Sequence, residues 1–230
     1  MTRDEVLAIY SARYAETYDE AFLHGEHYEE ATAFELAWLR EHMPPGGSWL
    51  DAACGTGWFL SQFPDVDRCG LDLSPAMLDV ARSHNPDVPF LEADFREPQP
   101  QLEARFDLVT LMWWAYCYAG SVPAIRKTIA NVAAWTKPGG SCFVPMCDPA
   151  ELTQLPLRNQ LGGSELTAIV WDWTDQRCRT VHGNLIAPHR DVFVQMFASH
   201  FDSVEVIDYP PFRTDAVGGT RRAVWGRGRR

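Results

Sequence analysis

The segment LDAACGTG, from Leu50 to Gly57, constrains the fold more than any other part of the chain. An apolar run ends at Asp51, and small residues then lead to Gly55 and Gly57 before a helical pattern begins. A buried strand that turns through glycines into a helix is the opening unit of a parallel, doubly wound sheet. We therefore expect a ligand at this turn, and the first question is whether that ligand carries phosphate.

Strand and helix patterns alternate along most of the chain. Apolar runs predict five buried strands, within residues 48–53, 67–73, 88–94, 105–113 and 141–148. Helices are predicted before and between them, near residues 6–17, 26–42, 57–63, 74–84 and 121–136. Ser74 is the expected N-cap of the fourth helix, with Pro75 at its first position. Parallel strands need such crossover helices, so the pattern favours an α/β sheet with helices on both faces.

The pattern changes between about Ala150 and Pro188, where residues 165–175 and 177–186 predict an inserted β-hairpin. A helix at 190–200 and strands at 203–210 and 221–228 follow. The predicted fold is Rossmann-like: a doubly wound, mostly parallel seven-stranded sheet with an antiparallel terminal strand. We expect one domain, 1–230, whose parts are a helical segment (1–44), a ligand-binding core (45–149), an inserted segment (150–188), and the last helix with the terminal strands (189–230).

Composition excludes several classes of function. A formal net charge of −11 disfavours nucleic acid and anionic membranes as partners. No apolar run reaches 18 residues, so we expect a cytoplasmic protein. The six cysteines form no CxxC pair, which argues against a metal site and for free thiols. We interpret the tail RRAVWGRGRR as a basic edge strand rather than a phosphate-binding site.

The glycine turn lacks the dinucleotide fingerprint GxGxxG. In the frame that starts at Gly55 the third glycine is replaced by Leu60, and the frame that starts at Ala53 fails as well. Asp51 would repel a pyrophosphate, but it suits a cationic amino group. Asp72 ends the second strand, 21 residues later, where a carboxylate accepts the hydroxyls of a ribose.

A third carboxylate completes the pattern. Asp94 ends the third strand, where it is placed to accept a hydrogen bond from an adenine amino group. Met77 and Phe95 are placed to pack on the adenine ring. An amine, a ribose and an adenine without phosphate describe S-adenosylmethionine.

Residues 45–148 resemble the class I S-adenosylmethionine-dependent methyltransferases of the small-molecule type. The resemblance is carried by WLDAACGTG, CGLDLSPAML, LEADFRE, FDLVTLMWW and TKPGGSCFV in this order. One departure is Ala53, where many members have glycine. The resemblance implies that the cofactor contacts Tyr10, Arg13, Asp51, Ala53, Gly55, Gly57, Asp72, Leu73, Met77, Asp94, Phe95, Met112 and Trp113.

The N-terminal helices are similar to the lid of such enzymes. In YSARYAETYDEAFLHGEHY, the residues Tyr10, Arg13 and Tyr14 are candidates to face the methionine part of the cofactor, with Tyr18 and Tyr28 behind them. The alternative is that these helices only cover the sheet.

Aromatic residues after the fourth strand predict the methyl-transfer site, because the faces of aromatic rings hold a cationic donor. The predicted acceptor pocket contains Trp114, Tyr116, Tyr118, Arg158, Trp171 and Trp173. Candidate catalytic residues are Tyr14, His182 and His189, and His27 is a further available imidazole. The segment TLMWWAYCY has no carboxylate, so we expect no metal, and it lacks the Asn/Asp-Pro-Pro-Tyr/Phe tetrapeptide of methyltransferases that act on adenine or glutamine.

These features predict methyl transfer from S-adenosylmethionine to nitrogen or oxygen of a small acceptor, with S-adenosylhomocysteine as the second product. An amino sugar or an intermediate of natural-product biosynthesis is the expected acceptor, and the chain is expected to be a monomer or a homodimer. Two alternatives remain open at this point. One is an inactive cofactor-binding regulator or scaffold, and the other is a nicotinamide oxidoreductase with a degenerate fingerprint.

Overall fold

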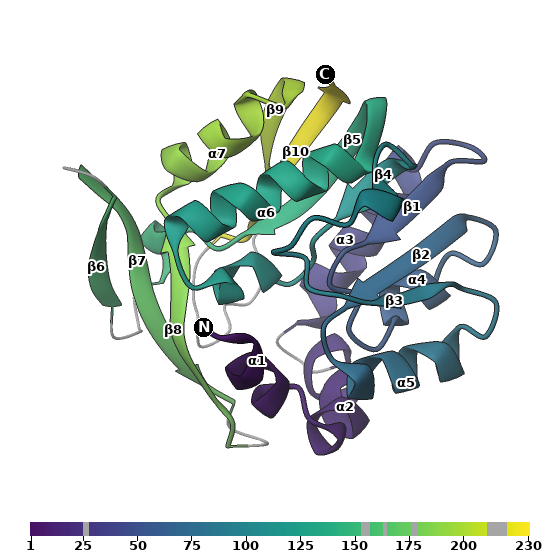
Figure 1. Cartoon of the computed structure of the whole chain (residues 1–230), viewed down its shortest axis with the longest axis horizontal. Coiled ribbons are helices and arrows are strands. Elements are labelled where there is room, and N and C mark those ends of the chain that lie inside the picture. Colours follow the sequence, from purple (N-terminus) through teal and green to yellow (C-terminus); the bar gives the residue numbers. More distant parts are fainter. Residues whose placement is uncertain (25–27, 153–156, 163–164, 176–178, 211–219) are drawn as a thin grey trace.

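The computed structural model describes residues 1–24, 28–152, 157–162, 165–175, 179–210 and 220–230. Its centre is a seven-stranded sheet (Figure 1). The strands are β1 (Ser48–Asp51), β2 (Asp67–Asp72), β3 (Phe90–Glu92), β4 (Phe106–Thr110), β5 (Thr136–Met146), β9 (Phe201–Asp208) and β10 (Arg222–Arg229). Their order across the sheet is β3-β2-β1-β4-β5-β10-β9.

The pairing confirms the predicted topology. Strands β1 to β5 pair in parallel, whereas β10 is antiparallel to both β5 and β9. The strand order reverses between β1 and β4, whose carboxyl ends are Asp51 and Thr110. Ligands of doubly wound sheets bind in the crevice at this kind of reversal.

Helices cover both faces because neighbouring residues of each strand point to opposite sides. Leu50 and Val109 face α6 (Val122–Trp135) and α7 (Arg190–Ala198). Their neighbours Trp49 and Leu108 face the opposite layer. That layer is built from α3 (Glu29–His42), α4 (Trp58–Ser61) and α5 (Pro75–His84). The Ser74 hydroxyl caps α5 by accepting a hydrogen bond from the Met77 amide at 3.2 Å, as predicted.

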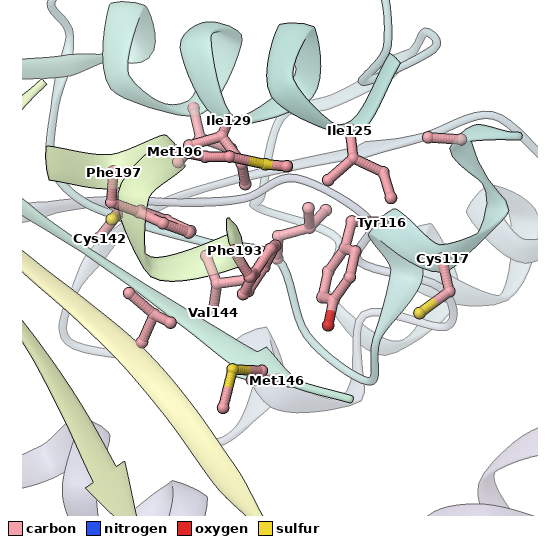
Figure 2. Packing of buried hydrophobic residues seen from close by; sticks show 14 of the residues in the cluster. Tyr116, Cys117, Ile125, Ile129, Cys142, Val144, Met146, Phe193, Met196 and Phe197 are labelled. Carbon is pink, nitrogen blue, oxygen red and sulfur yellow. The ribbon is translucent and has the colours of Figure 1, made fainter. Parts of the chain in front are cut away.

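The larger core lies between β5 and the pair α6 and α7 (Figure 2). The inner positions predicted for α6 are all buried, at Val122, Ile125, Ile129 and Val132. In Figure 2, side chains of α7 fill the space between α6 and β5. This packing fixes the strand ends, and therefore the residues that follow β4.

The N-terminal segment departs from the prediction of one helix over residues 6–17. It forms α1 (Arg3–Ile9), α2 (Ala12–Tyr18) and a π-helix, η1 (Asp19–Leu23). The chain leaves the helical conformation at Tyr10 and restarts after Ser11, which is extended. The Tyr10 carbonyl freed by this break accepts a hydrogen bond from the Ser74 hydroxyl at 2.6 Å. The break therefore attaches the segment to the end of β2.

The inserted segment is larger than the predicted hairpin. Strands β7 (Glu165–Thr174) and β8 (Val181–Pro188) form that hairpin, and β6 (Leu157–Gly162) extends it to a three-stranded antiparallel sheet. The polar sequence of β6 has no alternating apolar pattern, so the prediction missed it. The small sheet lies beside α1 (Figure 1), and β8 packs against the 3₁₀ helix η3 (Ala115–Ala119).

The junction between α6 and β5 also differs from the prediction. KPGG was expected to separate the helix from a strand at 141, but β5 begins at Thr136, directly after α6. The register with β4 shifts between Phe106 and Leu108, and Gly139 has a φ of +79°. The glycines therefore form an irregularity inside the strand. No helix in the described part of the chain has the length and hydrophobicity needed to cross a bilayer.

Candidate functional site

Asp51 lies at the carboxyl end of β1 and is 1% exposed. Its carboxylate accepts a hydrogen bond from the Thr110 hydroxyl at 3.0 Å. Burial raises the pKa of Asp51 to about 7, against the opposing effect of Thr110, and the nearby Asp72 raises it further. A cation placed beside Asp51 would restore its ionised form.

Asp72 is oriented by backbone groups. Its two carboxylate oxygens accept the amides of Gly55 at 2.9 Å and Ser74 at 2.8 Å. Gly55 has a φ of +52°, which favours glycine and directs its N–H toward this carboxylate. Burial raises the pKa of Asp72 although these hydrogen bonds lower it. Each oxygen retains lone-pair capacity for a further donor.

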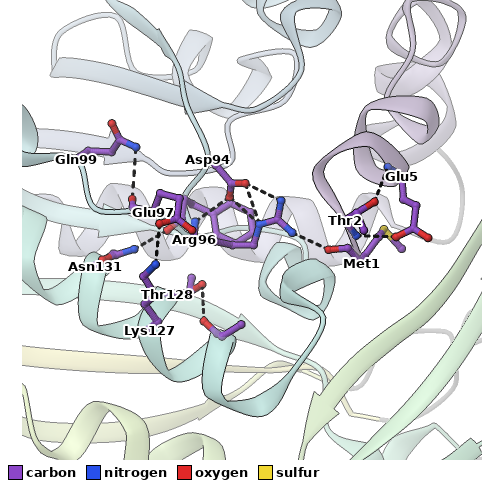
Figure 3. Close-up of polar contacts among 12 residues, drawn as sticks. Met1, Thr2, Glu5, Asp94, Arg96, Glu97, Gln99, Lys127, Thr128 and Asn131 are labelled. Carbon is purple, nitrogen blue, oxygen red and sulfur yellow. Dashed lines mark hydrogen bonds and ion pairs between the residues drawn. The ribbon is translucent and has the colours of Figure 1, made fainter.

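Asp94 has a partner that the sequence did not predict. Arg96 binds it in a fork: Nε lies 2.8 Å from Oδ1 and Nη2 lies 2.6 Å from Oδ2 (Figure 3). Burial raises the pKa of Asp94, but Arg96 outweighs this effect and holds it below its usual value. Arg96 also donates to the carbonyl of Met1 at 2.8 Å. The Asp94 oxygens are therefore already engaged, and an adenine amino group would have to share them.

A partly open cavity joins these three carboxylates, with about 840 Å³ of free space when the solvent at its mouth is included. The predicted cofactor residues that line it are Tyr10, Asp51, Ala53, Gly55, Asp72, Leu73, Met77, Asp94, Phe95, Met112 and Trp113. The N-terminal segment closes it, because the Thr56 hydroxyl donates to Asp19 of η1. We call this space the first cavity.

A second, partly open cavity adjoins the first, with about 630 Å³ of free space when the solvent at its mouth is included. Four residues line both cavities: Tyr10, Tyr18, Trp113 and Tyr118. Its remaining walls come from the N-terminal segment, the start of α3, the loop after β4, the small sheet and the residue before β10. The residues are Tyr14, Phe22, Tyr28, Trp114, Cys117, Trp171, Trp173, His182, Leu185 and Arg221.

Two residues with a strained backbone lie where the two cavities adjoin. Trp113 and Trp114 both adopt left-handed conformations, with φ of +54° and +58°. This conformation is costly for residues other than glycine and concentrates at functional sites. Here it places the Trp113 ring against both cavities and the Trp114 ring against the second.

His182 connects three segments at the wall of the second cavity. Its Nδ1 lies 2.6 Å from the Tyr118 hydroxyl, and its Nε2 lies 3.3 Å from the Tyr14 hydroxyl. Burial lowers the pKa of His182 to about 4, although Asp175 opposes the shift. The ring is therefore neutral at pH 7, with one nitrogen donating and the other accepting. It holds the N-terminal segment, the loop after β4 and the small sheet together.

Residues 50–140 match a family described as a methyltransferase domain. They include the end of β1, the glycine turn and the carboxylates of the first cavity. Over this segment the chain is similar to methyltransferases. The solved structure of one protein with a similar fold, the methyltransferase CalS10, has S-adenosylmethionine bound.

Curated relatives of the chain share about a third of its residues over the matched region. A dTDP-4-amino-2,3,4,6-tetradeoxy-D-glucose N,N-dimethyltransferase of Saccharopolyspora spinosa is 33% identical over 143 residues, covering 61% of this chain and 57% of that protein. A dTDP-3-amino-3,6-dideoxy-alpha-D-glucopyranose N,N-dimethyltransferase of Streptomyces fradiae is 35% identical over 142 residues, covering 60% and 54%. The match therefore spans little more than half the length of these relatives.

Solved methyltransferase structures share the fold over nearly the whole chain. CalS10, an amino pentose methyltransferase from Micromonospora echinaspora, has a TM-score of 0.64 at 22% identity, covering 93% of this chain and 96% of that one. The 1,6-didemethyltoxoflavin-N1-methyltransferase of Burkholderia thailandensis has a TM-score of 0.60 at 16% identity, covering 100% and 92%. At these identities the similarity shows the fold alone.

The residues of the first cavity fit the chemistry of S-adenosylmethionine. Asp51 could hold the amino group, and the free lone pairs of Asp72 could accept ribose hydroxyls. Met77 and Phe95 provide apolar walls, and the Asn131 side chain fixes the Phe95 carbonyl at 2.9 Å. Ala53 lines the cavity, so its methyl group is accommodated where many family members have glycine.

Two residues predicted to bind the cofactor lie outside both cavities. Arg13 is exposed on the outer side of α2. Gly57 is the N-cap residue of α4 and has a φ of +69°. A Cβ at this position would lie 2.9 Å from the side-chain nitrogen Nδ2 of Asn85. Gly57 therefore permits close packing of α4 on α5, and does not line the cavity.

Three residues predicted for acceptor binding or catalysis also lie elsewhere. Tyr116 is fully buried, because the 3₁₀ turn directs its ring onto Phe193, at 4.3 Å between ring centroids. Arg158 is exposed and pairs with Asp172 on the small sheet. His189 is the N-cap residue of α7 and lines neither cavity. His27 lies outside the described residues.

The sequence reasoning missed Arg96 and Arg221. Arg96 lies two residues after Asp94, so the pair had a local signal. Arg221 was grouped with the basic tail, but its guanidinium lies over the rings of Tyr28, Trp113 and Trp114, at 5.2, 5.6 and 5.3 Å. No sequence pattern connects these residues, because they meet only in the folded chain.

Proposed function

We propose that the protein transfers a methyl group from S-adenosylmethionine to the amine nitrogen of a small acceptor, and that this acceptor is an amino sugar. The observation that carries the proposal is the shared wall of the two cavities, formed by Tyr10, Tyr18, Trp113 and Tyr118. A methyl donor in the first cavity would meet an acceptor in the second at the junction that these four residues line. The printed names of the two relatives, both amino-sugar N,N-dimethyltransferases, support the choice of acceptor.

The residues of the first cavity would hold and orient the cofactor. When bound, S-adenosylmethionine supplies an activated methyl group on a cationic sulfur. Asp51 would pair with its amino group, and Asp72 would accept the ribose hydroxyls. Trp113, which lines both cavities, offers an aromatic face to a cation near the junction. No metal ion is needed for this displacement, since the chain has only to align nucleophile and methyl in a water-poor space.

The residues of the second cavity would position the acceptor amine. Aromatic walls exclude water, which favours a neutral amine whose lone pair is free to attack. The Tyr118 hydroxyl, fixed by His182, would accept a hydrogen bond from the amine N–H and direct the lone pair toward the methyl group. Tyr14 and His182 are thus positioning residues, because the neutral imidazole is too weak a base to hold a proton from an ammonium ion.

An activity assay tests the proposal. The protein is incubated with S-adenosylmethionine and dTDP-3-amino-3,6-dideoxy-alpha-D-glucopyranose, and S-adenosylhomocysteine and methylated sugar are measured by mass spectrometry. We expect one methyl group on the sugar for each S-adenosylhomocysteine formed, so a dimethylated sugar would correspond to two. Tight S-adenosylhomocysteine binding without methylation of this or other amino sugars would contradict the proposal and favour the scaffold alternative.

A matched pair of variants tests the alignment. Tyr118→Phe removes the hydroxyl at the cavity junction and should lower kcat by about tenfold or more, as expected for a lost hydrogen bond to the reacting group. Tyr116→Phe removes a neighbouring hydroxyl that accepts a hydrogen bond from the Cys147 amide in the core and lines neither cavity. It should lower stability slightly and leave kcat unchanged. Equal kcat values for the two variants would contradict the role of Tyr118.

A further inference from the structure

The second cavity has an unusual charge balance. Among the described residues that line it, Arg221 is the only side chain with a permanent charge. The other polar groups are neutral at pH 7: the His182 imidazole and the hydroxyls of tyrosines. No aspartate or glutamate is part of this described lining. Arg221 therefore contributes a positive charge to the described lining, although the whole chain carries a net charge of −11.

Aromatic rings hold Arg221 in place. Its guanidinium lies over Tyr28, Trp113 and Trp114, and the latter two have the strained backbone described above. Stacking on rings orients a guanidinium without using its hydrogen-bond donors. The group carries five N–H donors in a planar fork, so it can bind an anion and keep other contacts.

The buried carboxyl group of Glu35 lies outside the second cavity and offsets the charge of Arg221 only in part. Glu35 is 2% exposed and accepts the Tyr209 hydroxyl at 2.7 Å. Burial raises the pKa of Glu35 to about 7, while Tyr209 and the charge of Arg221 lower it. Near pH 7 Glu35 is therefore only partly ionised. It also does not line the second cavity, so a ligand in that space meets the charge of Arg221 first.

We propose that Arg221 binds an anionic group of the acceptor, a phosphate or a carboxylate, while the acceptor amine lies at the Tyr118 end of the same cavity. This inference rests on the proposed amine acceptor and narrows it to amines that also carry a negative charge. The fixed cation has a second effect, since it disfavours the protonated form of an amine in the same cavity. Arg221 would thus determine specificity and help to keep the nucleophile neutral.

Binding of three related amino sugars tests the proposal. Glucosamine, glucosamine 1-phosphate and muramic acid share an amino sugar, and the last two add a phosphate or a carboxylate. Each is titrated calorimetrically into the protein saturated with S-adenosylhomocysteine. We expect at least one anionic sugar to bind about tenfold or more tightly than glucosamine, as for a charge-assisted hydrogen bond. The preferred anion distinguishes a phosphate source from a carboxylate source.

Variants assign the effect to one residue. Arg221→Gln should abolish the preference for the anionic sugar, whereas Arg221→Lys should retain part of it. Arg227→Gln makes the same charge change on β10, where Arg227 pairs with Glu205 and lines neither cavity, and it should keep the full preference. All variants should bind S-adenosylhomocysteine as the parent protein does, which verifies their folding.

Different results would contradict the anion site at Arg221 and the proposed methyl transfer to an amine. No preference for an anionic sugar in the parent protein, or the same preference in Arg221→Gln, would overturn the role of Arg221. If glucosamine is methylated as fast as the anionic sugars, the proposed methyl transfer stands and the anion site is wrong. If none of these sugars nor the dTDP-amino sugar yields S-adenosylhomocysteine, the proposed function itself is contradicted.

Discussion

The ionisation of Asp51 should control the affinity for the cofactor. Its pKa of about 7, caused mainly by burial, means that the carboxyl is largely neutral at pH 5 and half ionised at pH 7. The cationic amino group of the ligand binds only the ionised carboxylate of Asp51. Below pH 7, binding must therefore release a proton from this carboxyl group. Affinity for S-adenosylhomocysteine should therefore rise with pH until the carboxyl is ionised, and level off above pH 8.

The expected change is large enough to measure. For a single group of pKa 7, the ionised fraction rises about fifty-fold between pH 5 and pH 7, or roughly 2.3 kcal/mol of binding free energy. Asp51→Asn keeps the size of the side chain and an oxygen for Thr110, but removes the charge. At pH 8 it should weaken binding by roughly 1.5–3 kcal/mol, the value of a hydrogen bond to a charged group.

Titration calorimetry at pH 5, 6, 7 and 8 gives the affinities, and repeating it in buffers of different ionisation enthalpy gives the protons released. Glu35→Gln is the matched control, because Glu35 also has a pKa of about 7 but lines neither cavity. That variant should keep the rise of affinity with pH, moved to somewhat lower pH because the charge of Glu35 also raises the pKa of Asp51. Asp51→Asn should lose the rise. A flat profile for the parent protein, or an unchanged profile for Asp51→Asn, would refute the reasoning.

Other predictions concern the ribose site, the lid and the glycine turn. Asp72→Ala should weaken S-adenosylhomocysteine binding by roughly 1.5–3 kcal/mol in calorimetry, and unchanged affinity would remove the ribose assignment. Deleting residues 1–25 should reduce methyl transfer far more than it lowers the melting temperature of the sheet, whereas intact activity would exclude a lid. Gly57→Ala should destabilise the fold by roughly 1–3 kcal/mol in thermal unfolding, because its φ is positive and Asn85 is close. Normal stability would show that the α4–α5 contact tolerates a side chain.

Local signals were sufficient to predict the sheet and the carboxylates of the first cavity. Apolar runs ending at Asp51 and Asp72 identified strands β1 and β2, and parallel pairing places such strand ends at one edge. Ser74 and Pro75 gave the start of α5 through capping chemistry alone. These features depend on residues close together in sequence, which is why a single sequence contains them.

Features that depend on tertiary contacts could not be predicted. The segment MWWAYCY contains four aromatic rings, but only the left-handed turn at Trp113 and Trp114 decides which of them face a cavity. Tyr116 belongs to the core for this reason, and Tyr118 to the site. Arg221 reaches the second cavity from the far end of the chain, and helical periodicity gave no sign of the break at Tyr10.

The central claim is that the first cavity holds the methyl donor and the second holds the acceptor. The two molecules meet at the junction lined by Tyr10, Tyr18, Trp113 and Tyr118. A crystal structure with S-adenosylhomocysteine bound tests it most directly. We predict the amino group at Asp51, the ribose at Asp72, and the sulfur at the junction formed by Tyr10, Trp113 and Tyr118, facing the second cavity. A sulfur directed away from the second cavity, or a ligand bound outside the first, would contradict the account.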